Sequence, residues 1–256
     1  MVLRQGTGKN SDFHHLGYRS AMKPIVIFRH ARTEGPGYLG QFLDEKEIPW
    51  RLIRIDEGEA LPGSALDLSG IVLMGGPMSV NDDLPWIPPL LELIREAVKA
   101  DIPVLGHCLG GQLMTKALGG VVRRNPVKEI GWGEVLVDNN AEAQHWFGEL
   151  QKFQGFHWHG ETFTLPAGAS RLLTSGYCQN QAYSMGKHLA FQCHVEMTTD
   201  MVKTWCEVGA EELAQAVASP GVQQTAEILH DLESRVAALN AVAKPIYERW
   251  ITGLAG

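Results

Sequence analysis

Short apolar runs alternate with longer amphipathic segments between residues 24 and 106. The apolar runs predict strands at residues 24–28, 50–55, 70–74 and 102–106. The spacing of apolar residues predicts helices at residues 38–46 and 85–100. A strand that returns to its sheet through a helix runs parallel to the strand before it. This order therefore predicts an α/β fold with a mostly parallel central sheet and helices on both faces.

The pattern changes after residue 134. Short strand-like runs and turns continue to residue 194 and predict a small, partly antiparallel extension of the sheet. Two amphipathic stretches at residues 201–217 and 222–239 predict helices, and Pro245 is expected to interrupt or kink the last helix. We expect these C-terminal helices to pack on the same core. A surface that binds a partner protein is the alternative.

These patterns divide the chain into three parts. Residues 1–22 are polar and rich in glycine, and we expect them to form a flexible N-terminal extension. Residues 23–198 carry the alternating pattern and are expected to form one α/β domain. Residues 199–256 are expected to form a helical segment packed on that domain.

Composition and charge narrow the class of protein. The 256 residues are 45% hydrophobic and 20% charged, which is typical of a globular protein in water. The net charge of −7 argues against nucleic-acid binding. No apolar stretch approaches the ~18 residues that span a membrane, and no signal peptide is recognisable. The chain has four cysteines: Cys108, Cys178, Cys193 and Cys206. So few cysteines in so long a chain predict no disulfide framework, which favours a cytoplasmic location.

One of these cysteines stands in a distinctive frame. The sequence Gly-His-Cys-Leu-Gly at 106–110 directly follows the apolar run at 102–105. A strand that turns sharply into a helix through such a frame is a nucleophile elbow, which exposes the central side chain at the carboxyl end of a sheet. The positive end of the helix dipole would favour a thiolate at Cys108. Without a base nearby, the same frame is only a tight turn around a buried cysteine.

A histidine and a carboxylate are candidates for the base. Residues 187–194 have the pattern of a short buried strand. His194 and Glu196 are two positions apart, so in extended backbone both side chains point to the same face, while Cys193 points away. A carboxylate beside an imidazole fixes its tautomer and stabilises the imidazolium. A His-x-Glu pair alone is more often a surface ion pair, but together with the elbow we interpret it as catalytic.

Two glycines after another strand predict an oxyanion site. Gly75 and Gly76 follow the apolar run at 71–74, and they allow a backbone N–H to approach a ligand closely. The second donor would be the N–H of Leu109, the residue after the cysteine. On its own, a Gly-Gly-Pro sequence is more typical of a turn that closes a strand.

Three motifs, in this order, carry a resemblance to a known family. Gly-Gly-Pro-Met-Ser-Val at 75–80, Gly-His-Cys-Leu-Gly-Gly-Gln at 106–112 and Phe-Gln-Cys-His-Val-Glu at 191–196 resemble class I (triad-type) glutamine amidotransferases, especially the free-standing, GMP-synthetase-like glutaminase domains. The resemblance implies the flavodoxin-like fold of that family and a catalytic domain at 23–198. Valine replaces the proline that the family often has between histidine and glutamate, which leaves both functional groups in place.

The resemblance implies a role for each motif residue. Cys108 would be the nucleophile, His194 the base and acid, and Glu196 the carboxylate that orients the histidine. Gly76 and Leu109 would provide the N–H groups of the oxyanion hole.

Other positions are similar to those that bind glutamine in this family. Gln112 matches a glutamine that helps to hold the substrate. The stretches at 128–135 and 158–163 resemble segments that line the glutamine pocket. They add Trp132 and His159, together with Gly75, to the expected substrate-binding residues.

The resemblance implies hydrolysis of the glutamine side-chain amide through a γ-glutamyl thioester, with release of glutamate and ammonia and without a cofactor. His157 and His159 have no cysteine or carboxylate at zinc spacing beside them, so we expect no metal site. No P-loop is present, so the expected protein is either a glutaminase subunit that works with a separate synthetase subunit or a free glutamine hydrolase. The alternatives are a γ-glutamyl peptidase acting on glutathione-like compounds and a non-catalytic regulatory module of the same fold.

Overall fold

The first strand divides the protein interior into two halves. Ile25 and Ile27 of β1 (Ile25–Arg29) belong to one buried cluster, whereas Val26 and Phe28 belong to a second cluster on the other face. Both faces of the strand are therefore covered. This is the arrangement expected of a parallel sheet between two layers of helices.

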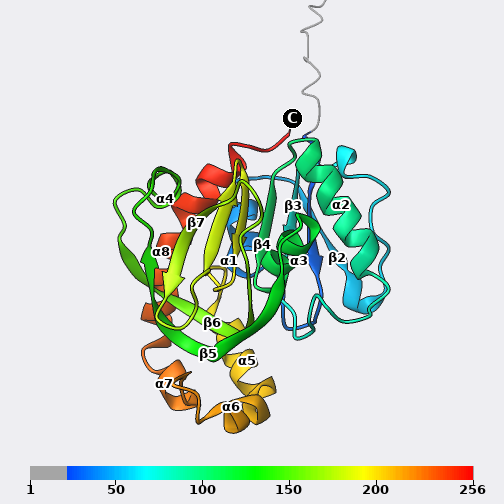
Figure 1. Cartoon of the computed structure of the whole chain (residues 1–256). Coiled ribbons are helices and arrows are strands. Elements are labelled where there is room, and N and C mark those ends of the chain that lie inside the picture. The colour runs from blue at the N-terminus through cyan, green and yellow to red at the C-terminus, as the bar shows by residue number, and fades with distance from the viewer. Residues whose placement is uncertain (1–21, 256) are drawn as a thin grey trace, which may run out of the picture.

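The computed structural model describes residues 22–255, so the extension predicted for residues 1–22 lies, apart from its last residue, outside the described residues. The sheet has ten strands in the order β10-β5-β7-β8-β9-β4-β3-β1-β2, and β6 pairs with β5 (Figure 1). The pairs within its parallel half are β1–β2, β1–β3, β3–β4 and β4–β9. Besides β1, this half consists of β2 (Trp50–Arg54), β3 (Gly70–Leu73), β4 (Val104–His107) and β9 (His188–Phe191). The predicted mostly parallel sheet is confirmed.

The other half of the sheet is mainly antiparallel. It consists of β5 (Val122–Val137), β6 (Lys152–Phe163), β7 (Ser170–Ser175), β8 (Ala182–Met185) and the short β10 (Gly221–Val222). The prediction of only short strands in this region was wrong, because β5 has 16 residues and β6 has 12. Polar and glycine positions interrupt their apolar pattern, yet the two strands stay paired over most of their length.

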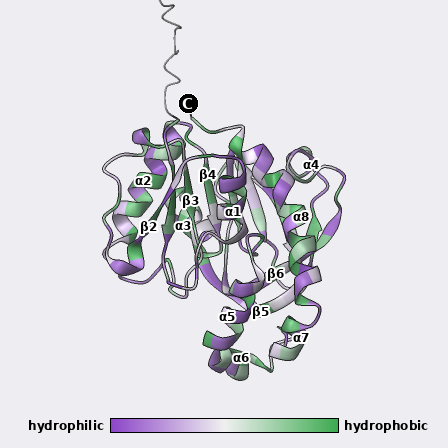
Figure 2. Cartoon of the chain, turned by 180° about the vertical axis from the view of Figure 1, so that it is seen from behind, coloured by the Kyte–Doolittle hydropathy of each residue, from purple (hydrophilic) through white to green (hydrophobic). Residues whose placement is uncertain are grey.

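Helices cover both faces, as predicted. α1 (Gly37–Glu45), α4 (Ala141–Phe147) and α8 (Leu232–Ile251) contribute to the first buried cluster. α2 (Ile87–Lys99) and α3 (Leu109–Ala117) contribute to the second cluster. Figure 2 shows hydrophobic residues along the central strands β3 and β4, whereas α2 is mixed in character. No helix within residues 22–255 is long and apolar enough to cross a membrane.

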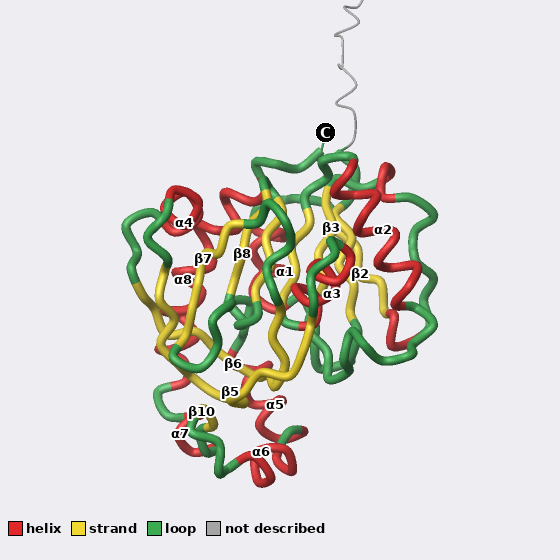
Figure 3. Tube along the Cα trace, viewed as in Figure 1, coloured by secondary structure: helices red, strands yellow, loops and turns green. Residues whose placement is uncertain are grey.

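The C-terminal helices differ in detail from the prediction. The stretch predicted as one helix at 201–217 forms α5 (Thr199–Val208) and α6 (Ala210–Ala216), which meet at Gly209. A Cβ on Gly209 would lie only 2.3 Å from the Trp158 ring, so the chain can turn there against β6. Together with α7 (Thr225–Leu229), these helices lie at one end of the molecule, next to β5 and β6 (Figure 3).

Pro245 does not interrupt the last helix. α8 runs through this residue and continues to Ile251. The proline removes one backbone donor, but Ile246, Tyr247 and Trp250 beyond it are almost fully buried. Burial of these large side chains outweighs the local preference, as tertiary packing commonly does in helices.

Candidate active site

Cys108 lies in the sharp turn between β4 and α3. Its φ of +51° and ψ of −108° are strained for a residue with a side chain. Its N–H donates to the carbonyl of Phe191 at 2.8 Å, which ties the turn to β9. A Cβ on Gly106 would lie 2.5 Å from the carbonyl of Gly110, and a Cβ on Gly110 would lie 2.0 Å from that of Leu73. The backbone therefore has the geometry of the predicted elbow, and both glycines are sterically required.

His194 and Glu196 meet, although not on a strand. β9 ends at Phe191, so the predicted strand through residue 194 was wrong. Instead, the N–H of His194 donates to the carbonyl of Phe156 on β6 at 2.8 Å. Nδ1 of His194 lies 2.7 Å from Oε1 of Glu196. The ring of Trp205 on α5 packs edge-on against the imidazole at a centroid distance of 4.8 Å, which fixes the orientation of the ring.

The charges around this pair favour its ionised form. Burial lowers the pKa of His194, but the charge of Glu196 and the interaction with Cys108 outweigh burial and raise that pKa well above its usual value. Burial raises the pKa of Glu196, but the charges of His107 and His194 outweigh it and lower that pKa to about 2. The site therefore holds a proton on the imidazole beside an ionised carboxylate.

Two neighbours of these residues were missed by sequence reasoning. His107 is fully buried, and its Nδ1 lies 3.1 Å from Oε2 of Glu196. Gln192 donates from Nε2 to Sγ of Cys108 at 3.5 Å and accepts from Nε2 of Gln112 at 3.1 Å. The sequence offered one signal for both residues. His107 and Gln192 are polar side chains within apolar strand sequences, and they directly precede Cys108 and Cys193, respectively.

The two residues predicted to form the oxyanion hole have backbone N–H groups without a backbone partner in the described part of the chain. Among residues 22–255, the N–H groups of Gly76 and Leu109 meet no backbone acceptor. A Cβ on Gly76 would lie 2.8 Å from the Leu109 side chain, so the two loops are adjacent. Gly75 faces another side chain, because a Cβ there would lie 2.5 Å from Oε2 of Glu34.

A cavity of about 350 Å³ opens beside the elbow. Five of the residues predicted from sequence line it: Gly76, Cys108, Gln112, His159 and His194. Hence the candidate nucleophile, the candidate base and one oxyanion residue share a single cavity. This is the arrangement expected where a reacting atom must contact all three.

The remaining predicted residues lie behind the cavity or away from it. Glu196 is fully buried beneath His194. Trp132 does not line the cavity, although its sequence context suggested that it would. Its ring packs edge-on against Phe156, and its indole N–H donates to the carbonyl of Ile228 at 3.0 Å. The contacts of Trp132 are thus those of a core residue that anchors α7.

Another part of the cavity wall was not predicted, apart from Trp158, which lies in the predicted pocket segment 158–163. It consists of Trp158 on β6, Trp205 and Val208 on α5, and Glu212 on α6. Glu212 accepts from Nζ of Lys128 at 2.6 Å and from the indole N–H of Trp158 at 2.8 Å. No short motif marks Trp205, Val208 and Glu212, because the packing of α5 and α6 against β6 brings them to the cavity.

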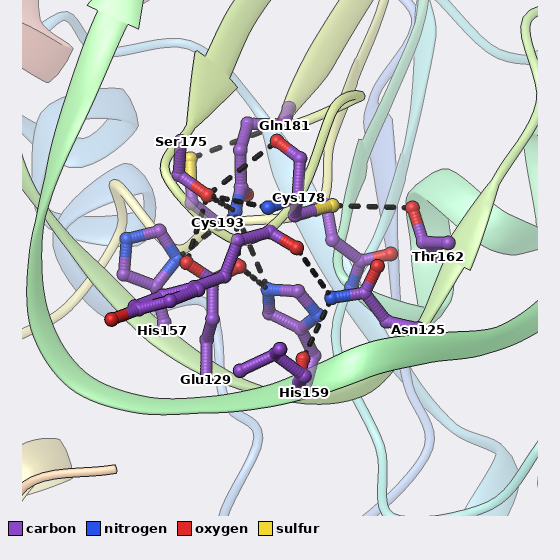
Figure 4. A network of polar contacts seen from close by, with 12 residues as sticks. Asn125, Glu129, His157, His159, Thr162, Ser175, Cys178, Gln181 and Cys193 are labelled. Atoms are coloured by element: carbon purple, nitrogen blue, oxygen red, sulfur yellow. Dashed lines mark hydrogen bonds and ion pairs between the residues drawn. The ribbon is translucent and has the colours of Figure 1, made fainter. Parts of the chain in front are cut away.

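A second polar cluster includes His159 of the cavity and side chains of β5, β6 and β7 (Figure 4). Glu129, His157 and His159 place ligand atoms within 4.8 Å of one another. Sequence reasoning found no carboxylate for these histidines, but β5 pairs Glu129 directly with His159. Gln181 reaches the middle of the cluster and donates to Oε2 of Glu129 at 2.8 Å and to Oγ of Ser175 at 3.0 Å. These contacts form a hydrogen-bonded network, and the absence of a metal remains a prediction.

Comparisons with known proteins agree with one another. The family model described as glutamine amidotransferase class-I matches residues 43–204. Glutamine amidotransferase-like protein YfeJ of Salmonella typhimurium is 31% identical over 78% of this chain and 86% of its own length. Gamma-glutamyl peptidase 3 of Arabidopsis thaliana is 27% identical over 65% of this chain and 71% of its own. A crystal structure of a glutamine amidotransferase from Methylobacillus flagellatus is 47% identical, with a TM-score of 0.90 over 92% of this chain and 96% of that one.

Proposed function

The chain belongs to the family of class I glutamine amidotransferases, and on this basis we propose that it hydrolyses the side-chain amide of glutamine through a thioester on Cys108. The observation that carries the proposal is the shared cavity of Cys108 and His194, with Glu196 bonded to the histidine from behind. A strained elbow, a buried imidazole and two N–H groups are the parts that acyl transfer requires.

The first half-reaction forms the acyl-enzyme. Sγ of Cys108 attacks the side-chain carbonyl carbon of glutamine, and the carbonyl oxygen becomes an oxyanion. The N–H groups of Gly76 and Leu109 stabilise this oxyanion, at about 3 kcal/mol for each donor. His194 gives its proton to the amide nitrogen as the C–N bond breaks, so ammonia leaves and a γ-glutamyl thioester remains on Cys108.

The second half-reaction releases glutamate. Water gives a proton to His194 while its oxygen attacks the thioester carbon, and the C–S bond then breaks. Cys108 leaves as a thiolate beside the imidazolium. Glu196 holds the imidazole in one orientation through both steps, and the raised pKa of His194 supports its role as proton carrier. None of these steps uses a metal ion or an organic cofactor.

A γ-glutamyl peptide is the second candidate substrate. It shares the glutamyl half with glutamine and differs only in the group on the leaving nitrogen. The cavity supports this candidate because it extends to Val208, which is 66% exposed, so a larger leaving group can reach solvent there. The similarity to an Arabidopsis γ-glutamyl peptidase supports it as well. If glutamine is the substrate, a separate synthetase that consumes the ammonia belongs to the proposal.

Glutamate release from L-glutamine and, separately, from glutathione tests both substrates. Cys108→Ala is expected to abolish turnover, because the acyl-enzyme can no longer form. Cys206→Ala is the matched control, since this buried cysteine on α5 does not line the cavity, and it should retain activity. Turnover that survives in Cys108→Ala would overturn the proposed nucleophile. A wild-type chain that hydrolyses neither compound would instead favour the regulatory module.

A further inference from the structure

One carboxyl group in the cavity has no role in the reaction described above. Glu34, in the loop between β1 and α1, lines the cavity together with Cys108 and His194. The groups that act on it are His194 and Glu196, both through charge and neither through a hydrogen bond. The other carboxylates of the cavity are engaged, since Glu161 accepts from Oγ of Ser79 at 3.0 Å and Glu212 binds Lys128.

The loop that carries Glu34 is fixed on both sides of this residue. The indole N–H of Trp205 donates to the carbonyl of Thr33 at 2.8 Å. The N–H of Tyr38 donates to the carbonyl of Glu196, also at 2.8 Å. Both partners belong to the segment that surrounds His194. The carboxyl of Glu34 is therefore positioned by the same elements that position the imidazole.

Glu34 approaches the side of the site from which the amine departs. A Cβ on Gly75 would lie 2.5 Å from Oε2 of Glu34 and 3.4 Å from Cε1 of His194, so both side chains approach the same backbone atom. In the proposed reaction the oxyanion faces Gly76 and Leu109, while the leaving nitrogen faces His194. A carboxyl beside His194 is thus near the nitrogen that His194 protonates.

The protonation of Glu34 suits such a position. Burial is the main cause that raises the pKa of Glu34 to about 7. The charge of His194 lowers this pKa, and the charge of Glu196 raises it. At neutral pH a substantial fraction of Glu34 carries a proton. An amine is a stronger base than a carboxylate with this pKa, so a proton passes readily from Glu34 to a released amine.

We infer that Glu34 receives the leaving amine: its carboxyl hydrogen-bonds the departing nitrogen and gives it a proton, so that the amine leaves as an ammonium ion. This inference rests on the proposed function. His194 supplies the proton that accompanies C–N cleavage, and Glu34 supplies a second proton to the neutral amine afterwards. Glu34 is left as a carboxylate and regains its proton from water. The protonated amine has no lone pair, so it cannot attack the thioester in the reverse direction.

The choice of leaving group tests this role. The full chain and its Glu34→Gln variant are compared with L-glutamine, which releases an amine, and with glutamate γ-methyl ester, which releases an alcohol. Glu34→Gln should lower kcat for glutamine by about 10- to 100-fold, because an amide side chain cannot give a proton to the amine. Ester hydrolysis should change by less than about threefold, since methanol needs no second proton.

The pH profile provides an independent readout. Wild-type turnover of glutamine should fall as the pH rises through about 7, where Glu34 loses its proton, and this limb should be absent in Glu34→Gln. Glu233→Gln is the matched control, because the side chain of Glu233 is 76% exposed and does not line the cavity, and the kinetics of this variant should equal those of the wild type. If Glu34→Gln does not fold, Glu34→Ser makes the same comparison.

An equal loss with amide and ester, or no loss with either, would overturn the role of Glu34 while leaving the proposed function intact. A wild-type chain that hydrolyses neither glutamine nor the ester would overturn both. The two failures are therefore distinguishable in one set of assays.

Discussion

Two of the buried histidine–carboxylate pairs within residues 22–255, His194–Glu196 and His159–Glu129, differ in what the second ring nitrogen meets. Nδ1 of His194 lies 2.7 Å from Glu196, and Nε2 of His159 lies 3.1 Å from Glu129. All four residues are at most 5% exposed. Nδ1 of His159 is bonded to the carbonyl of Glu161 at 2.9 Å. Nε2 of His194 has no hydrogen-bond partner among the described residues, and His194 lines the same cavity as Cys108, which helps to raise the pKa of this histidine.

This difference separates the pair that we propose to be reactive from one whose contacts are structural. An imidazole with one nitrogen held by a carboxylate and the other facing a sulfur can take up and release a proton. An imidazole with both nitrogens engaged by protein groups instead connects strands, and its proton has nowhere to go. Burial and carboxylate contact alone therefore do not identify a catalytic histidine.

The largest expected effect comes from replacing each histidine in turn. His194→Asn should lower kcat by about 1,000-fold or more, because the proposed mechanism assigns the proton transfer during C–N cleavage to His194 alone, and it should leave the fold intact. His159→Asn should lower kcat by less than about 10-fold but cost about 1–3 kcal/mol of stability, since it leaves Glu129 buried with one partner fewer. Steady-state turnover and urea unfolding of both variants measure the two quantities. Similar kinetic losses in the two variants would remove the distinction between the pairs.

The second-largest expected effect is a loss of folding stability in acid, caused by protonation of Glu196. The pKa of Glu196 is lowered from 4.5 to about 2 in the folded chain. A carboxyl with a lowered folded pKa stabilises the fold above its unfolded pKa, and this contribution is lost as the pH falls from about 4.5 to about 2. Glu196→Gln should cost about 3 kcal/mol at neutral pH, because it leaves a buried imidazolium without its partner.

The difference in unfolding free energy between wild type and Glu196→Gln should therefore shrink as the pH is lowered over this range. Urea unfolding between pH 2 and 7 measures it, and Glu233→Gln serves as the exposed control. A difference that stays constant with pH would show that Glu196 is not ionised in the folded chain.

The residues around Cys108 and His194 were more predictable from the sequence than the network around His159. The elbow, the glycines at 75–76 and the His194–Glu196 pair follow local rules, because each lies within a few residues of a strand end. The network around His159 could not be found in this way. Glu129 reaches His159 only through the register of β5 and β6, which shifts between Arg124 and Glu129. Strand pairing of this kind depends on the whole fold and not on local pattern.

The part of the cavity wall that α5 and α6 supply was unpredictable for a related reason. Trp158, Trp205 and Glu212 come from one strand and two helices, and packing alone brings them together. The apolar spacing of α5 and α6 indicated helices, but it did not indicate which surface they would cover. The break at Gly209, which allows α6 to contact Trp158, was missed because a single glycine within a helical pattern is often tolerated.

The smallest expected effect concerns Gln112, which sequence similarity assigned to substrate binding and which the structure bonds to Gln192. If Gln112 acts through Gln192 on Cys108, Gln192→Ala should slow alkylation of Cys108 by iodoacetamide about 3- to 10-fold, the value of one hydrogen bond. Gln112→Ala should then add little in the Gln192→Ala background, because both changes interrupt the same chain of contacts. Alkylation is the suitable measurement, since it reports on the sulfur without requiring glutamine to bind. If Gln112→Ala instead raises KM for glutamine equally in both backgrounds and leaves alkylation unchanged, Gln112 contacts the substrate directly, and Gln192 alone positions the sulfur.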